Sequence, residues 1–195
     1  MGIEYELKFR ATEEILQQVA AAYPEGHTHF HMQTTYYDTP SGGLSARHYT
    51  LRRRMENEIS VCTLKTPAGN DSRQELEIQC EDIGEAVSRF AQMGAPEDFL
   101  PVTAEGVTPI CAADFHRTAI TLTFPDCTLE LALDRGTLIG GGRTVPLCEL
   151  EIELKEGTPF SVQVFALELV SRYGLVPEKY SKFRRALALY KGESL

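Results

Sequence analysis

Residues 4–8 of the sequence are EYELK, and residues 151–155 have the nearly identical sequence EIELK. Each stretch places glutamate, glutamate and lysine at alternate positions, with a large apolar residue between them. Alternate residues of a β-strand point to the same side of its sheet. Both stretches therefore predict strands that have one charged face and one apolar face.

The same alternation of polar and apolar residues continues through most of the sequence. It predicts about eight strands, at residues 3–10, 34–39, 49–67 (two strands joined by a tight turn at Glu56 and Asn57), 73–79, 114–124, 128–139 and 145–157. Helical spacing and capping residues predict helices at residues 12–23, 81–94, 159–174 and 178–192. Because no segment reads as a linker, we expect one α+β domain that spans residues 1–195.

Composition and charge exclude several classes of function. The net charge of −9 argues against a broad surface for a nucleic-acid polymer or an anionic membrane, and we expect neither partner. No apolar run is long enough for a transmembrane helix, and we expect no leader peptide. The five cysteines are odd in number and never form C-x-x-C, which predicts free thiols in a reducing cytoplasm. The sequence leaves the oligomeric state open.

The charged strand faces have two interpretations. Taken singly, each face fits an antiparallel sheet with one solvated side and one side packed on helices. Taken together, the faces carry many like charges, which destabilise a sheet when they lie opposite each other. About eight such strands can instead close into a barrel with the charged faces inside. Burial of isolated carboxylates costs several kcal/mol, so such an interior has to be wet, paired and complemented by a ligand.

A polyphosphate with a hard divalent cation supplies that complement. Mg²⁺ binds through one or two carboxylates together with substrate phosphates, and arginine offers forked donors to phosphate oxygens. The sequence therefore predicts a metal held by carboxylates of the two echoing strands and a phosphate chain held by basic strands. The predicted metal ligands are Glu4, Glu6, Glu151 and Glu153, and the predicted phosphate binders are Arg52, Arg54, Arg117, Lys65 and Lys182.

An ordered set of motifs resembles the CYTH family, the triphosphate tunnel metalloenzymes. The set runs along the whole sequence as EYELK (4–8), YYDTP (36–40), LRRR (51–54), TLK (63–65), RQELE (73–77), Arg117 in FHRTAI, LALDRG (131–136), ELEIELK (149–155) and SKFRRAL (181–187). The resemblance implies an eight-stranded antiparallel closed β-barrel that forms a tunnel with a polar interior, flanked by helices. It also implies a short triphosphate as the small-molecule substrate, and Mg²⁺ or Mn²⁺ as the cofactor.

The resemblance also assigns roles by position. Lys8 joins the phosphate binders, Asp134 joins the metal ligands as an acidic tunnel residue, and Arg185 assists Lys182. Glu75 and Glu77 remain less defined. We expect Glu4 or Glu6, with Glu153, to orient or deprotonate the attacking water. Lys8, on the same face, favours the ionised carboxylate.

The resemblance leaves several functions open. The leading one is metal-dependent hydrolysis of inorganic tripolyphosphate, that is, a triphosphatase. A class IV adenylyl cyclase and a thiamine triphosphatase are alternatives within the family. A non-catalytic binder of polyphosphate or nucleotide is the alternative from a different class, but it has no need of the metal glutamates.

One further motif stands outside this scheme. HTHFH at residues 27–31 places three histidines at alternate positions, a spacing that suits a metal clip. Because no carboxylate lies beside it in the sequence, we interpret it as a solvated or loop segment.

Overall fold

The computed structural model describes residues 5–69 and 73–194. Its strands form one antiparallel sheet in the order β5-β4-β3-β2-β6-β7-β8-β1-β9. The strands are β1 (Glu6–Arg10), β2 (His27–Asp38), β3 (Thr50–Glu56), β4 (Ile59–Pro67), β5 (Arg73–Gln79), β6 (Thr108–Thr123), β7 (Thr128–Gly140), β8 (Arg143–Glu156) and β9 (Val176–Pro177). The helices are α1 (Glu13–Ala22), α2 (Gly43–Ala46), α3 (Ile83–Gln92), α4 (Phe99–Thr103), α5 (Pro159–Tyr173) and α6 (Lys182–Lys191). The predicted α+β, antiparallel fold is confirmed.

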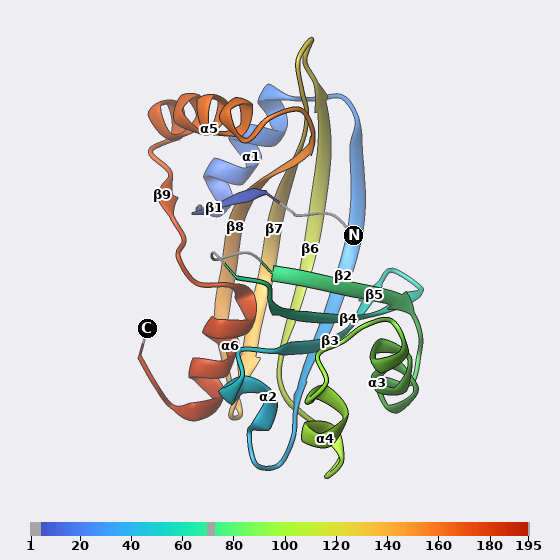
Figure 1. Cartoon of the computed structure of the whole chain (residues 1–195). Helices are drawn as coiled ribbons and strands as arrows, with labels where there is room; N and C mark the ends of the chain where they lie inside the picture. Colours follow the sequence, from blue (N-terminus) through green and yellow to red (C-terminus); the bar gives the residue numbers. More distant parts are fainter. Residues whose placement is uncertain (1–4, 70–72, 195) are drawn as a thin grey trace.

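The sheet curls so strongly that strands far apart in its order face each other. In Figure 1 the long strands β2, β6, β7 and β8 run side by side, and β3, β4 and β5 cross in front of them. Side chains of β5 and of β1 line one common cavity, although β5 and β9 are the two edges of the hydrogen-bonded order. The predicted tunnel shape is therefore present, while no strand ladder within the described ranges joins the two edges.

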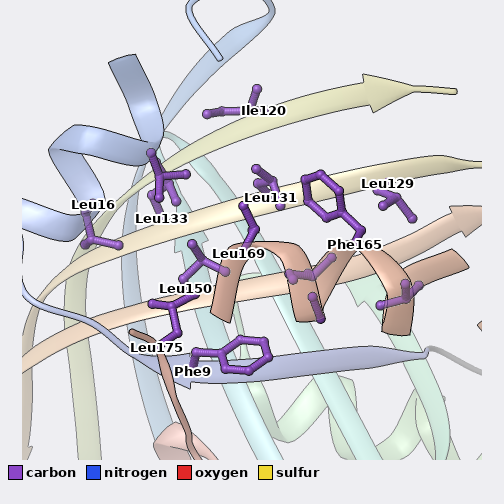
Figure 2. Close-up of a cluster of buried hydrophobic side chains, with 14 of the residues drawn as sticks. Phe9, Leu16, Ile120, Leu129, Leu131, Leu133, Leu150, Phe165, Leu169 and Leu175 are labelled. Atoms are coloured by element: carbon purple, nitrogen blue, oxygen red, sulfur yellow. The ribbon is translucent and has the colours of Figure 1, made fainter. Parts of the chain in front are cut away.

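The outer face of the long strands is covered by α1 and α5. Leu129, Leu131 and Leu133 of β7 alternate toward these helices, as the strand period requires. Figure 2 shows them packed with Leu16 of α1 and Phe165 of α5. Apolar residues at helical spacing thus meet apolar residues at strand spacing, which leaves the other face of β7 to polar side chains.

The helix α6 packs on the inner face of the sheet. Leu138 and Leu147, on the inner faces of β7 and β8, form a core with Ala186 and Leu187 of α6. The approach is close enough to require glycine at position 140, because a Cβ there would lie 2.4 Å from the carbonyl oxygen of Ala186. The interior is therefore apolar next to α6 and polar beyond it.

Two strands are longer than predicted, and no helix has the character of a membrane span. The strand β2 begins at His27 and β6 begins at Thr108, so the interpretation of HTHFH as a loop segment is wrong. The turn after Glu56 is confirmed, and Asn57 adopts the left-handed conformation with φ 54°. Among the described helices, none combines the length and apolar content needed to cross a bilayer.

Candidate functional site

A cavity of about 500 Å³ lies inside the curled sheet and reaches α6. Strand alternation points the charged faces identified in the sequence into this space. Of the predicted site residues, the ones that line it are Glu6, Lys8, Arg52, Arg54, Lys65, Arg117, Glu151, Glu153 and Lys182. One cavity therefore collects side chains from strands at both ends of the sheet order, and its charges fall on two walls.

The basic wall is formed by β3, β4 and β5. Arg52 and Arg54 of β3 point inward together with Lys65 of β4 and Arg73 of β5. The Nε atoms of Arg52 and Arg54 are buried without a hydrogen-bond partner among the described residues. Buried polar groups are normally hydrogen-bonded, so these two donors fit an anionic ligand that would enter the cavity.

The charges on this wall are only partly balanced. The Glu75 carboxylate lies 2.8 Å from Lys65 Nζ and 3.7 Å from a terminal nitrogen of Arg52, and Arg54 is paired with Glu56. Burial and the neighbouring charge of Arg52 nevertheless lower the pKa of Arg54. A phosphate chain between these guanidinium groups would remove their mutual repulsion and supply acceptors for the unpaired donors.

The acidic wall is formed by β7, β8 and β1. The strand register places Glu153 opposite Glu130 on one side and opposite Glu6 on the other, so three carboxylates form a row across the sheet. Lys155 Nζ lies 2.8 Å from Glu153 and 3.7 Å from Glu130, and Lys8 Nζ lies 2.9 Å from Glu6. Adjacent like charges destabilise a sheet, and a divalent cation at this row would relieve that repulsion.

A network of buried ion pairs lies between the acidic wall and α6. Asp134 of β7 is fully buried and accepts hydrogen bonds from Arg117 Nε and a terminal nitrogen of Arg117, both at 2.7 Å. Lys182 Nζ lies 2.9 Å from Asp134, 2.5 Å from Glu149 and 2.8 Å from Glu151. Arg117 also donates to Glu151 at 2.6 Å. Each charge in this network therefore has an opposite charge in contact.

These contacts set the ionisation of the network. Burial opposes the charge on Glu151, but Lys182 and Arg117 outweigh it and hold the pKa of Glu151 well below its usual range. Burial likewise opposes the charge on Lys182, and the surrounding carboxylates, Asp134 first, raise its pKa. Burial dominates at Glu149 and raises its pKa to about 7, against the effect of Lys182.

A second layer of contacts holds α6 against the sheet. Arg185 is paired with Glu149 and lies 3.3 Å from Glu178, while Arg10 Nε donates to Glu178 at 2.8 Å. The backbone N–H of Glu178 also donates to the carbonyl of Lys8 at 2.8 Å. The α6 residue Lys182 is thereby fixed relative to β1 and β8.

Not every predicted residue reaches the cavity. Asp134 and Arg185 lie behind its surface, where they contact the cations and carboxylates described above. The prediction for Glu4 falls outside the described residues. The alternation places Arg73, Glu130 and Lys155 on charged strand faces, but the sequence assigned them no role, and all three line the cavity.

The donor set fits a hard divalent cation. Ligand oxygens of Asp134, Glu149 and Glu151 lie within 4.8 Å of one another, and Glu6, Glu130 and Glu153 follow along the acidic wall. Carboxylate oxygens are the ligands of Mg²⁺ and Mn²⁺. Arg117, Lys182 and Arg185 already neutralise the tighter group, so the row on the open wall is better suited to receive a cation.

Taken together, the fold and cavity define a tunnel protein with facing acidic and basic walls. The chain matches the CYTH domain over residues 2–187 and belongs to the CYTH family. It is 32% identical over 162 residues to an inorganic triphosphatase of Haemophilus influenzae, an alignment that covers 79% of this chain and 46% of that protein. It is also 32% identical over 91 residues to an uncharacterised protein of Mycobacterium tuberculosis, covering 44% of this chain and 16% of that protein. The chain thus spans less than half the length of these relatives.

Solved structures with the same fold are more distant in sequence. A Hippeastrum protein, HpAC1, described as a candidate adenylyl cyclase with a dominant triphosphatase activity, superposes with a TM-score of 0.63 at 19% identity, covering 100% of this chain and 98% of that chain. The PH1819 protein of Pyrococcus horikoshii gives a TM-score of 0.62 at 20% identity, covering 94% and 98%. These likenesses support the fold.

Proposed function

We propose that this chain is a metal-dependent hydrolase of short triphosphates and that inorganic tripolyphosphate is its substrate. The observation that carries the proposal is the pair of unmatched buried donors on Arg52 and Arg54, which share one cavity with the carboxylate row of the acidic wall. The resemblance to the Haemophilus influenzae triphosphatase supports the same reaction. The proposal treats residues 1–195 as a single tunnel domain.

In the proposed complex the basic wall binds the phosphate chain. Arg52 and Arg54 donate to its oxygens with the forked geometry that suits phosphate, and Lys65 contributes a point charge. From the opposite side Arg117 and Lys182 contribute positive charge, while Asp134 holds both in place. This positioning of the chain before reaction supplies part of the rate enhancement.

The acidic wall holds the cation and the water in this proposal. Glu6 and Glu153 of the open row would be its ligands, together with Glu151, which borders the buried network but also lines the cavity. The sequence proposes Glu4 as a further ligand. A bound Mg²⁺ or Mn²⁺ would neutralise charge that develops on the phosphate oxygens. Glu6, with Glu153, orients the attacking water or accepts its proton, and Lys8 Nζ lies 2.9 Å from the Glu6 carboxylate, which it holds on the same strand face.

The proposed role of Asp134 differs from that of the other acidic residues. Its contacts with Arg117 and Lys182 use both of its carboxylate oxygens. We therefore propose that Asp134 positions these two cations at the phosphate chain. Arg185 acts in the same indirect way, because it orders Glu149 and Glu178 beneath α6.

The proposed setting is the cytoplasm. All five cysteines are free, and four of them are buried, which fits a reducing compartment. Burial raises the pKa of Cys111 to about 12, so this thiol stays protonated and inert at neutral pH.

The test is a parallel assay of three substrates. The protein is incubated with tripolyphosphate, ATP or thiamine triphosphate, each with Mg²⁺ or Mn²⁺, and released phosphate and cyclic AMP are measured. We expect phosphate from tripolyphosphate as the fastest reaction. Cyclic AMP from ATP would instead assign the cyclase reaction, faster cleavage of thiamine triphosphate would assign that substrate, and binding without turnover would assign a non-catalytic module.

The strand β3 supplies a matched control for the binding assignment. Arg53 lies between Arg52 and Arg54 but points to the other face, where it donates to the carbonyl of Glu81 at 2.9 Å. Arg54→Ala should weaken tripolyphosphate binding, and Arg53→Ala should leave it unchanged. Equal effects of the two substitutions would remove the cavity from the proposal.

A further inference from the structure

A group of metal-binding side chains lies on the outer face of the sheet, away from the tunnel. Phe30 and Met32 of β2 line the cavity, so His31 between them points to the outside. In the same way Phe115 and Arg117 of β6 point inward, and His116 points outward. The register pairs His31 directly with His116 across the two strands, which puts two imidazoles side by side.

A carboxylate completes this group. Asp114 precedes His116 by two residues on the same face of β6, and His31 Nε2 donates to its Oδ1 at 2.7 Å. The rings of His31 and His116 stack with centroids 4.6 Å apart and an interplanar angle of 19°. The missing carboxylate that led us to set HTHFH aside in the sequence is therefore supplied by a strand more than eighty residues away.

We propose that His31, His116 and Asp114 form a second metal site, selective for late first-row cations such as Zn²⁺, Ni²⁺ and Cu²⁺. Imidazole nitrogen suits these ions, whereas Mg²⁺ and Mn²⁺ prefer oxygen ligands. The site is thus chemically distinct from the carboxylate row inside the tunnel. It does not depend on the proposed reaction.

Two of the three side chains are already in contact, and the third has to approach them. Among the described residues, only the ligand atoms of Asp134, Glu149 and Glu151 all lie within 4.8 Å of one another as they stand, so the His116 ring has to turn toward His31 and Asp114 before one cation can bind all three. Zinc takes nitrogen and oxygen ligands at about 2.0–2.2 Å with tetrahedral angles, which sets His31 Nε2 and the Asp114 oxygen roughly 3.3 Å apart. The observed 2.7 Å has to open by only part of an ångström when the cation replaces the shared proton. His116 is exposed, so its ring is free to turn from the stacked position toward the cation.

The surrounding charges do not oppose the proposal. Asp114 accepts hydrogen bonds from His31 at 2.7 Å and from Gln33 at 3.3 Å, and an aspartate is ordinarily ionised at neutral pH. The cation on the neighbouring β7 position is Arg135, which stands opposite His116 and is neutralised by Glu13 of α1. In the turn after β3 the adjacent group is Asn57, which is uncharged and accepts a hydrogen bond from the His31 backbone N–H.

Electron paramagnetic resonance of bound Cu²⁺ tests the proposal directly, because nitrogen ligands split the signal and carboxylate oxygens do not. The protein is loaded with one equivalent of Cu²⁺ in excess Mg²⁺, and Zn²⁺ affinity is measured by competition with a chromophoric chelator. We expect the splitting pattern of two imidazole nitrogen ligands in the Cu²⁺ spectrum. The Zn²⁺ affinity should fall roughly tenfold or more in His31→Ala and in His116→Ala. Asp114→Asn should weaken the affinity while the nitrogen splitting persists.

Two control variants locate the site. His27→Gln should bind Zn²⁺ as the unchanged protein does, because His27 Nε2 is committed to the carbonyl of Tyr23 at 2.6 Å. Glu6→Gln, in the tunnel, should also keep the affinity and the nitrogen signal. Binding that survives both His31→Ala and His116→Ala, or that disappears with Glu6→Gln, would overturn the proposal.

Discussion

The buried network beneath α6 and the basic wall on β3 accommodate buried charge in different ways. On the side of α6, the carboxylates of Asp134, Glu149 and Glu151 are met by Arg117 and Lys182, and each charge has its partner. On the side of β3, the terminal nitrogens of Arg52 and Arg54 meet Glu75 and Glu56, but both Nε donors lack a partner among the described residues. The Nε of Arg185 on α6 shares this property, but it lies behind the cavity surface. The charges of the buried network are paired before a ligand arrives, whereas the basic wall keeps donors that a ligand can satisfy.

This difference separates residues that hold the site in shape from residues that hold the substrate. Removing one partner of a buried ion pair leaves an uncompensated charge and destabilises the fold. Removing a guanidinium group that binds the anionic substrate weakens binding. In the free protein, the same substitution relieves the repulsion between neighbouring guanidinium groups. Substitutions in the buried network should therefore mainly lower stability, and substitutions on the open walls should mainly lower binding or turnover.

The largest effect is expected on catalysis at the acidic wall. Glu6→Gln removes the carboxylate that we propose to orient the water and hold the cation, so kcat for tripolyphosphate should fall by roughly 10²–10³-fold or more. Its side chain is partly exposed, so the thermal unfolding midpoint should change little. Glu14→Gln on the surface of α1 serves as the matched control. Retention of most of the turnover in Glu6→Gln would remove Glu6 from the catalytic assignment.

The next effect is on stability, in the buried network. Lys182→Met leaves Asp134, Glu149 and Glu151 without their shared cation, and the free energy of unfolding should fall by about 3–5 kcal/mol. Urea denaturation followed by circular dichroism measures it, with the exposed Lys179→Met as control. If Lys182→Met lowers the free energy of unfolding no more than Lys179→Met does, the buried network does not stabilise the fold through its ion pairs.

On the basic wall the balance should reverse. Arg54→Ala should raise KM or Kd for tripolyphosphate by roughly 10–100-fold, the value of one or two charged hydrogen bonds, while the free energy of unfolding stays within about 1 kcal/mol. Steady-state kinetics and urea denaturation on the same preparation give both numbers. A large loss of stability with unchanged affinity would show that Arg54 belongs to the fold and not to the binding site.

The smallest effect is expected at Glu178, beneath α6, and it depends on pH. Burial opposes the charge on Glu178, but the Tyr180 backbone N–H and Arg10 outweigh it and lower its pKa. A depressed folded-state pKa contributes stability above the unfolded value of about 4.3 and loses it as pH falls through the folded value. Glu178→Gln should therefore cost about 1–3 kcal/mol at pH 7, and less at pH 3. A cost that does not shrink in acid would contradict the ionic origin of this contact.

Much of the fold could be predicted because its signal is local. Strand alternation at EYELK and EIELK depends only on neighbouring residues, and it placed Glu6 and Glu153 on an inward face without knowledge of their partners. The strand β2 shows the limit of that reading. Phe30 and Met32 carried the alternation through HTHFH, but the intervening histidines resemble a solvated segment, and the start of β2 was placed too late.

The rest of the site depends on pairing between distant segments. Contacts between distant segments decide that β8 lies beside β1 and that α6 packs on the inner face against Gly140. No local sequence pattern encodes these contacts. For that reason the contacts of Asp134 with Arg117 and Lys182 could not be foreseen, and its assignment as a metal ligand stays a prediction. The contact between His31 and Asp114 on the outer face could not be predicted from the sequence for the same reason.

The central claim is that the basic wall binds the phosphate chain and the acidic wall holds the cation. Calorimetric titration of tripolyphosphate in the presence of a chelator, followed by addition of Mg²⁺, tests it most directly. We expect the unchanged protein and the Glu6→Gln variant both to bind tripolyphosphate without metal. The double variant Arg52→Ala, Arg54→Ala should not bind it. After Mg²⁺ is added, only the unchanged protein should release phosphate. Undiminished metal-free binding by the double arginine variant would contradict the claim.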